Sequence, residues 1–256
     1  MNRSDLTSSG AGRSTFQVTN WSEILRAKTD DGSRRRAVVG NLMAAYWRPV
    51  YCYLRRKGYG NEVAKDLTQG FFHEIVLERD LFLRADPTKG RFRTFILTSL
   101  ERYVVDVHRY QTRRKNKPKG ELVRLDSTQL ANVPASRAET TPDQAFCYGW
   151  AASLLDEVLA ELRQEYCGTG KRLHWEVFRA KTLAPIFQNT RPPSLARLCR
   201  RLGIENEAKA SDMITTVKRR FRSVLRRRLR KLVGSDAEVE EEIREIRAIL
   251  AKRSAG

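Results

Sequence analysis

The sequence has few of the residues that build metal, redox and nucleophilic sites. Its four cysteines, Cys52, Cys147, Cys167 and Cys199, form no CxxC pair. The three histidines form no HExxH pair, and no loop of the GxxxxGK(S/T) or GxSxG type is present. We therefore predict small buried or incidental cysteines, no metal, no cofactor and no catalytic residue, so that the protein is not an enzyme.

The spacing of the acidic and histidine residues leaves one enzymatic alternative open. A metal-dependent nuclease could be built from Asp66, His73 and Asp106 if the fold brought them together. Asp106 and His108 are two residues apart on an expected helix and therefore point in different directions.

Long apolar runs are also missing. No stretch approaches the roughly 18 uncharged apolar residues that a membrane span needs. The amino terminus, MNRSDLTSSGAGRS, lacks the apolar core of a signal peptide. We expect a cytoplasmic protein that makes no use of a membrane.

Acidic residues are too few to balance the basic ones. The chain has 49 Lys and Arg against 30 Asp and Glu, a formal net charge of +19 and a pI near 10.3. Such an excess indicates a polyanionic partner, although charge alone does not separate nucleic acid from anionic lipid. With 256 residues and 41% hydrophobic content, the chain suits two small globular modules.

Apolar residues recur at helical intervals over most of the chain, and strand-like alternation is not found. We predict an all-α fold of two small helical domains joined by a flexible linker, the second containing a helix-turn-helix. Helices are expected over residues 21–59, 61–78, 91–110, 141–162 and 173–187, followed by a short helix and a much longer one. Val63, Leu67, Phe71 and Ile75 are expected to face the core of the first domain.

Several helix ends carry local signals. Asn61 is a candidate N-cap. In the second domain Thr141 can cap a helix whose third residue, Gln144, completes a capping box. Ser194 can cap the short helix LARLCRRL, and Gly203 can end it. A short helix, a turn and a long helix is the order of a helix-turn-helix.

A polar stripe follows the helix expected after residue 60. Because its members fall at steps of three and four, they lie on one side of that helix. A solvated face would look the same, but a basic protein can also use such a stripe to bind a cationic protein. The stripe consists of Glu62, Asp66, Gln69 and His73.

The next helix interleaves arginines with aromatic rings. Rings stack on unpaired bases and guanidinium groups neutralise phosphates, so the segment suits single-stranded nucleic acid. For Phe92, Phe95 and Tyr103 the alternative is that they are core residues, and we expect this of two of the three. The candidates are Arg91, Phe92, Arg93, Phe95, Arg102, Tyr103, Arg109, Arg113 and Arg114.

The long helix near the carboxyl terminus contains KRRFRSVLRRRLRK, residues 218–231, with no acid. When a helix next to a helix-turn-helix carries only positive charges, its Lys and Arg side chains are expected to contact DNA phosphates. An acidic segment, SDAEVEEEIREIRAIL, follows; it could dock on its own domain, compete with DNA through its acids, or pair with another protein. The DNA-binding candidates are Lys209, Ser211, Thr215, Lys218, Arg219 and Arg222.

These features, in this order, resemble the bacterial RNA polymerase sigma factors of the sigma-70 family, extracytoplasmic-function group. YWRPVYCYL, DLTQGFF and GRFRTFILTSLERYVVDVHR are similar to the first conserved domain of that family. FCYGWAASLLDEVLAELRQEY, SLARLCRRLG and VKRRFRSVLRRRL are similar to the second. The resemblance covers most of the chain, and DLTQ followed by GRFR is its most specific part.

The resemblance implies partners and roles. Asp66 and Gln69 match positions that grip the β′ clamp helices of core RNA polymerase, and the β flap is a second expected contact. Residues around Arg93, Phe95, Arg102, Tyr103, Asp106 and Arg109 match the promoter-melting and minus-ten elements, and the helix after Gly203 would read the minus-thirty-five element. Promoter DNA and an anti-sigma factor are the other implied partners.

Low periodicity and the prolines Pro118 and Pro134 predict a linker between the two domains, and the resemblance supplies the names of the domains. The expected parts are a tail (1–22), a region-2-like domain (23–115), a linker (116–140), a region-4-like domain (141–233) and an acidic carboxyl-terminal helix (234–256). A stand-alone helix-turn-helix regulator that binds duplex DNA without polymerase remains the alternative function.

Overall fold

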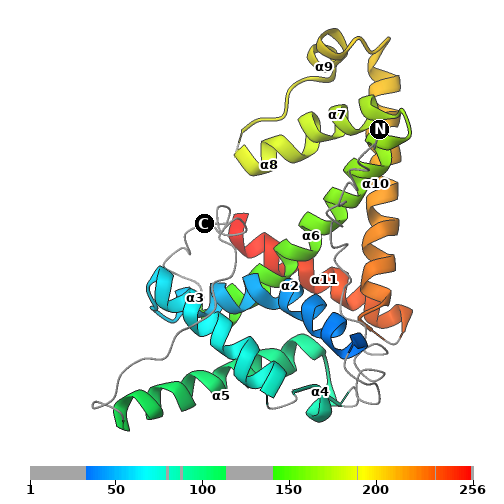
Figure 1. Cartoon of the computed structure of the whole chain (residues 1–256). Coiled ribbons are helices and arrows are strands. Elements are labelled where there is room, and N and C mark those ends of the chain that lie inside the picture. Colours follow the sequence, from blue (N-terminus) through cyan, green and yellow to red (C-terminus); the bar gives the residue numbers. More distant parts are fainter. Residues whose placement is uncertain are drawn as a thin grey trace, which may run out of the picture.

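The all-α prediction is confirmed by a computed structural model, which describes residues 33–78, 81–86, 89–113, 141–188, 190–233 and 235–254. Every regular element in these ranges is a helix (Figure 1). None of the described helices is long and apolar enough to cross a membrane. In chain order the elements are α2 (Ser33–Arg56), α3 (Asn61–Gly70), the π-helical segment η1 (Phe71–Glu78), α4 (Leu81–Arg84), α5 (Phe92–Arg113), α6 (Pro142–Gly168), α7 (Arg172–Phe178), the π-helical segment η4 (Arg179–Leu183), α8 (Ala184–Gln188), α9 (Leu195–Leu202), α10 (Glu207–Arg230) and α11 (Asp236–Ser254).

Helix ends follow the local sequence signals closely. The Thr141 hydroxyl accepts from the Gln144 amide, and the Gln144 side chain accepts from the Thr141 amide, so the predicted capping box of α6 is present. Ser194 caps α9, and Gly203 ends it in the left-handed conformation with φ 66°. The predicted cap at Asn61 is wrong by one residue, because Asn61 is already inside α3 and its side chain accepts from the Tyr51 hydroxyl at 2.5 Å.

The amino-terminal helices form a core of aromatic and aliphatic side chains. Phe71 packs edge-on against Phe72 and Tyr103, with ring centroids 5.3 and 5.7 Å apart. Tyr46 of α2 meets Phe92 of α5 in the same way at 5.8 Å. These contacts fix α5 against α2 and η1, and they thereby position the outer face of α5.

Helix α6 connects this part of the molecule to the rest (Figure 1). Its amino-terminal half packs on α2, where Gly149 lies against Pro49; a Cβ at Gly149 would be 3.0 Å from the Pro49 Cα. Its carboxyl-terminal half packs on α7 and α10. Buried residues of both halves therefore belong to one continuous hydrophobic cluster. The predicted linker, residues 116–140, lies outside the described residues.

The carboxyl-terminal part consists of α7 to α11. The segment predicted as one helix over 173–187 is continuous through α7, η4 and α8. Helix α9, a turn containing Gly203, and the longer α10 follow in the order that the sequence predicts. Asn206 caps α10 by accepting from the Lys209 amide at 2.8 Å. Helix α11 then returns across the molecule and contacts both α6 and α10 (Figure 1).

Candidate functional site

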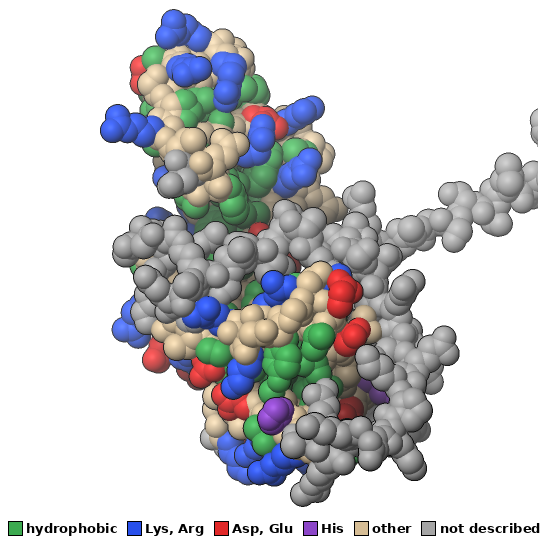
Figure 2. Space-filling model, turned by 90° about the vertical axis from the view of Figure 1, so that its left-hand side faces the viewer, with side chains coloured by type: hydrophobic (Ala, Val, Ile, Leu, Met, Phe, Trp, Pro, Cys, Tyr) green, Lys and Arg blue, Asp and Glu red, His purple; other side chains and the backbone are tan. Residues whose placement is uncertain are grey.

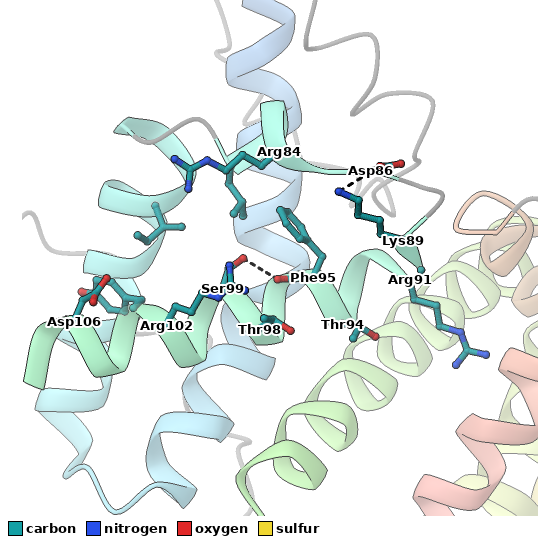
Figure 3. A pocket seen from close by; sticks show the side chains of 14 residues that line it. Arg84, Asp86, Lys89, Arg91, Thr94, Phe95, Thr98, Ser99, Arg102 and Asp106 are labelled. Atoms are coloured by element: carbon teal, nitrogen blue, oxygen red, sulfur yellow. Dashed lines mark hydrogen bonds and ion pairs between the residues drawn. The ribbon is translucent and has the colours of Figure 1, made fainter.

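A pocket of about 490 Å³ lies along one side of α5 (Figure 3). Thr94, Thr98 and Arg102 follow one another at steps of four residues, so successive helical turns place them in one row. Leu81 and Arg84 of α4 line the opposite wall. The pocket is therefore a groove between α4 and α5.

The pocket combines cations, hydroxyl groups and one accessible ring. Phe95 is half-buried and points from α5 toward α4 (Figure 3). The Ser99 hydroxyl donates to the Phe95 carbonyl oxygen at 2.8 Å. The cations outnumber the carboxylates, since Arg84, Lys89, Arg91 and Arg102 line the pocket together with Asp86 and Asp106.

This lining suits an unpaired nucleotide. A ring offers a stacking surface to any base, while guanidinium groups pair with phosphate oxygens. Arg84 and Arg102 are exposed, and neither forms an ion pair with a described carboxylate, so both can bind an incoming anion. Lys89 is held only loosely by Asp86, at 3.8 Å on the surface.

Three predicted nucleic-acid residues are core residues instead, and their assignment is corrected. Phe92 is 5% exposed and packs on Tyr46. Arg93 is 7% exposed. Tyr103 is buried against Phe71 and contributes only to the floor of the pocket. Burial raises the pKa of the Tyr103 phenol to about 12, so this group is neutral at physiological pH. Of the three rings that the sequence left ambiguous, only Phe95 is accessible.

Arg93 is buried because it is fully paired. Its guanidinium lies 4.5 Å from the Trp150 ring centroid and donates to Glu242 and Glu245 of α11. Burial by itself lowers the pKa of Arg93, but these carboxylates more than reverse the effect, and the guanidinium stays charged. Arg91, at the pocket rim, is bound to the same α11 carboxylates and points away from the pocket (Figure 3).

Of the remaining α5 candidates, Arg109 is exposed. Arg113 is the last residue of α5, and Arg114 lies outside the described residues.

The polar stripe of α3 and η1 faces outward. Glu62, Asp66 and His73 are exposed, and Gln69 is half-buried. Lys65 pairs with Glu62 at 2.9 Å on the surface. The stripe therefore presents a small acidic and amide-bearing surface.

The buried side of α3 differs from the sequence prediction at one position. Val63 is 49% exposed, so its assignment to the core is wrong. Leu67, Phe71 and Ile75 are buried as expected. Ala64 and Thr68 occupy the place expected for Val63, because the core side of the helix is rotated toward them.

All six predicted DNA-binding residues of α10 are exposed, and most of them form one row of successive turns. Lys209 pairs with Glu205 at 3.1 Å on the surface. The side chains of Lys218, Arg219 and Arg222 have no ion pair with a described carboxylate. On the face shown in Figure 2, the part formed by α7 to α10 carries many Lys and Arg side chains and few acidic ones.

The other side of α10 is not free for phosphate. Arg220 pairs with Glu165 at 3.0 Å, and Arg228 pairs with Glu157 at 2.5 Å and with Glu161 at 2.9 Å. These carboxylates follow at steps of four along α6 and form a row that faces α10. The prediction that the whole basic helix serves phosphate contact is therefore corrected: its α6-facing arginines hold two helices together.

Comparison with known proteins finds no match: no family model, no curated protein and no solved structure matches the chain.

Sequence reasoning missed the α4 wall of the pocket. The sequence predicts only a turn at ADPTKG, whereas Asp86 and Lys89 within this segment and Arg84 just before it line the pocket. A signal was present, since Thr98 and Thr94 lie one and two turns before Arg102 on the same side of a helix.

The nuclease alternative receives no support from this geometry. Within the described ranges, no three His, Cys, Asp or Glu side chains are grouped as metal ligands would be. Asp66, His73 and Asp106 are therefore not brought together as a metal-binding set.

Proposed function

We propose that the protein is a sigma-type initiation factor that binds core RNA polymerase, directs it to promoter DNA and helps to open the strands. In this proposal it works in the cytoplasm and without catalysis of its own. Strand opening draws its free energy from the capture of unstacked bases rather than from nucleotide hydrolysis.

The pocket along α5 is the observation that carries the proposal. Phe95 offers a stacking surface between Arg84 and Arg102, and hydroxyl groups line the wall beside it. Base stacking on such a ring contributes about 1 to 3 kcal/mol. A duplex-binding regulator has no need of such a pocket, because its bases stay paired.

Two further surfaces fit the same function. The row formed by Thr215, Lys218 and Arg222 on α10 suits the major groove and the phosphates beside it. The acidic stripe of α3 suits a basic protein and would repel DNA, so a protein partner is expected there. A single chain with these three surfaces can hold a large enzyme and an opened promoter together.

Retention of core RNA polymerase on the immobilised protein tests the α3 surface. Asp66 is exposed on α3, so Asp66→Arg reverses a charge without disturbing the core. We expect wild type to retain polymerase and Asp66→Arg to lose it. The control is Asp212→Arg, an equal charge reversal at an exposed position of α10.

The same experiment separates the proposal from its alternative. A stand-alone helix-turn-helix regulator would use α9 and α10 alone and would bind duplex DNA whether or not Asp66 is reversed. Undiminished retention of polymerase by Asp66→Arg would count against the α3 surface, and no retention by wild type would count against the initiation factor itself.

A further inference from the structure

Helix α11 packs on its own chain through an apolar side. Val239 and Ile246 are buried, and the helix contacts α6 and α10. In Figure 1 it crosses the middle of the molecule, between the α5 part and the α10 part. Its position brings the acidic residues of its first half close to both candidate nucleic-acid surfaces.

One carboxylate of α11 has a structural role. Glu242 is 1% exposed and pairs with Arg93, which is itself buried beside Trp150. A buried guanidinium and a buried carboxylate satisfy each other, and removal of either would leave an unpaired buried charge. This pair therefore holds α11 in place.

Two further carboxylates of α11 reach the partly exposed Arg91, which Glu242 already contacts at its Nε at 2.9 Å. Glu245 binds Arg91 as well as Arg93, and Glu241 lies 3.8 Å from Arg91. The Arg91 side chain is 34% exposed at the rim of the pocket, so water could solvate it without any carboxylate. The helix dipole does not account for these acids, since its effect is confined to the first turn and they lie in later turns.

The same helix also neutralises arginines of α10. Glu240 pairs with Arg226 at 2.6 Å, and Asp236 pairs with Arg230 at 3.2 Å. All four of these side chains are largely exposed. Acids of one helix thus pair with a cation at the rim of the pocket and with cations in the last turns of α10.

We infer that α11 is an intramolecular competitor of nucleic acid, which masks Arg91 and the carboxyl-terminal arginines of α10 until a phosphate backbone displaces its carboxylates. This inference rests on the proposed function, because it assumes that the two surfaces bind nucleic acid. The pairs of Arg91 with Glu241 and Glu245 are partly exposed and can exchange with phosphate. The apolar side and the buried Glu242, which binds Arg93 and the Arg91 Nε, keep the helix attached. A tethered competitor acts at high effective concentration, so even weak pairs reduce binding.

Binding of a short fluorescein-labelled single strand, followed by fluorescence anisotropy, tests the inference on the full chain. The variant is Glu241→Gln with Glu245→Gln, which removes two of the three carboxylates beside Arg91. It leaves Glu242 paired with Arg93 and with the Arg91 Nε, so that the two terminal nitrogens of Arg91 become available to phosphate. Asp156→Asn with Glu176→Gln is the control. It removes two exposed or partly exposed carboxylates, which pair with Arg48 and Arg179 away from the pocket.

We expect the variant, but not the control, to bind about fivefold more tightly at about 0.1 M salt. One additional phosphate contact on a single strand releases roughly 0.7 counterion, so the salt slope should steepen by that amount. In the Arg91→Gln background the same two Gln substitutions should bring no gain. Thermal unfolding by circular dichroism verifies that each variant is folded.

An affinity and salt slope equal to wild type in the folded variant, or an equal gain in the control, would overturn the inference while the proposed function stands. Absence of binding by both wild type and the variant at low salt would instead refute nucleic-acid binding itself.

Hydrogen exchange gives a second readout that needs no substitution. We expect α11 amides to exchange faster when the single strand is bound, and unchanged exchange in α11 with bound DNA would contradict displacement.

Discussion

Two arginines on the outer side of α10 provide the sharpest test of the duplex-binding surface. Arg219 and Arg222 are exposed and have no ion pair with a described carboxylate. Changing both to alanine removes two cations without breaking a described ion pair. Arg220 and Arg228 are unsuitable for this purpose because they bind carboxylates of α6.

The size of the effect follows from counterion release. Each phosphate contact on duplex DNA contributes about 0.9 to the slope of log affinity against log salt concentration, so the loss of two contacts flattens the slope by roughly 1.8. At about 0.1 M salt this corresponds to an affinity roughly 60-fold lower, provided that both guanidinium groups touch phosphate. Discrimination between promoter sequences should change little, since phosphate contacts carry no base information.

Anisotropy titrations of a labelled promoter duplex over a series of salt concentrations measure this slope. Arg163→Ala with Arg172→Ala is the matched control, because both residues are exposed and lie on α6 and α7. Arg163 is two residues from Glu161, so it points away from the row of α6 carboxylates that faces α10. A slope and affinity unchanged by the Arg219 and Arg222 substitutions, or changed equally by the control, would remove α10 from the interface.

Three further predictions concern packing, stacking and pH. Gly149→Ala should lower the free energy of unfolding by about 1 to 3 kcal/mol because the new methyl group crowds α2. Gly168→Ala should not lower it, since there is open space around Gly168. Equal denaturation midpoints of the two variants would contradict the close contact between α6 and α2. Phe95→Ala should weaken single-strand binding by about 1 to 3 kcal/mol and leave duplex binding unchanged, as compared by anisotropy; equal losses on both substrates would refute a stacking role. Burial by itself raises the pKa of Glu245, but the charges and hydrogen bonds of Arg93 and Arg91 lower it below its usual value of about 4.5. Because the folded-state pKa is depressed, the stabilisation is present above about pH 4.5 and is lost as the pH falls through the folded pKa. The melting temperatures of wild type and Glu245→Gln should therefore converge in acid, and a constant difference across that range would contradict the pairing.

Local features of the fold could be predicted from the sequence because their causes lie within a few residues. The capping box of Thr141 and Gln144 and the helix stop at Gly203 depend only on neighbouring backbone groups. The predicted position of the cap, Asn61, is wrong by one residue. The side-chain oxygen of Asn61 instead accepts from the hydroxyl of Tyr51, which belongs to another helix.

Partners distant in the sequence explain the larger errors. Arg93 resembles a surface cation until Glu242, 149 residues away, is placed beside it. The inner arginines of α10 resemble a phosphate-binding row, but the α6 carboxylates that bind them are 55 to 71 residues away. Periodicity identifies which side of a helix is polar, but it does not reveal which other helix lies against that side. The six candidates of α10 are exposed, as DNA contact requires, and their binding to DNA stays a prediction.

Run-off transcription by purified core RNA polymerase on a pool of genomic promoters, with and without this protein, tests the central proposal most directly. We expect transcripts with defined start points only when the protein is present, and their loss in the Asp66→Arg variant. Initiation at the same start points and with equal yield in the absence of the protein would contradict the proposal.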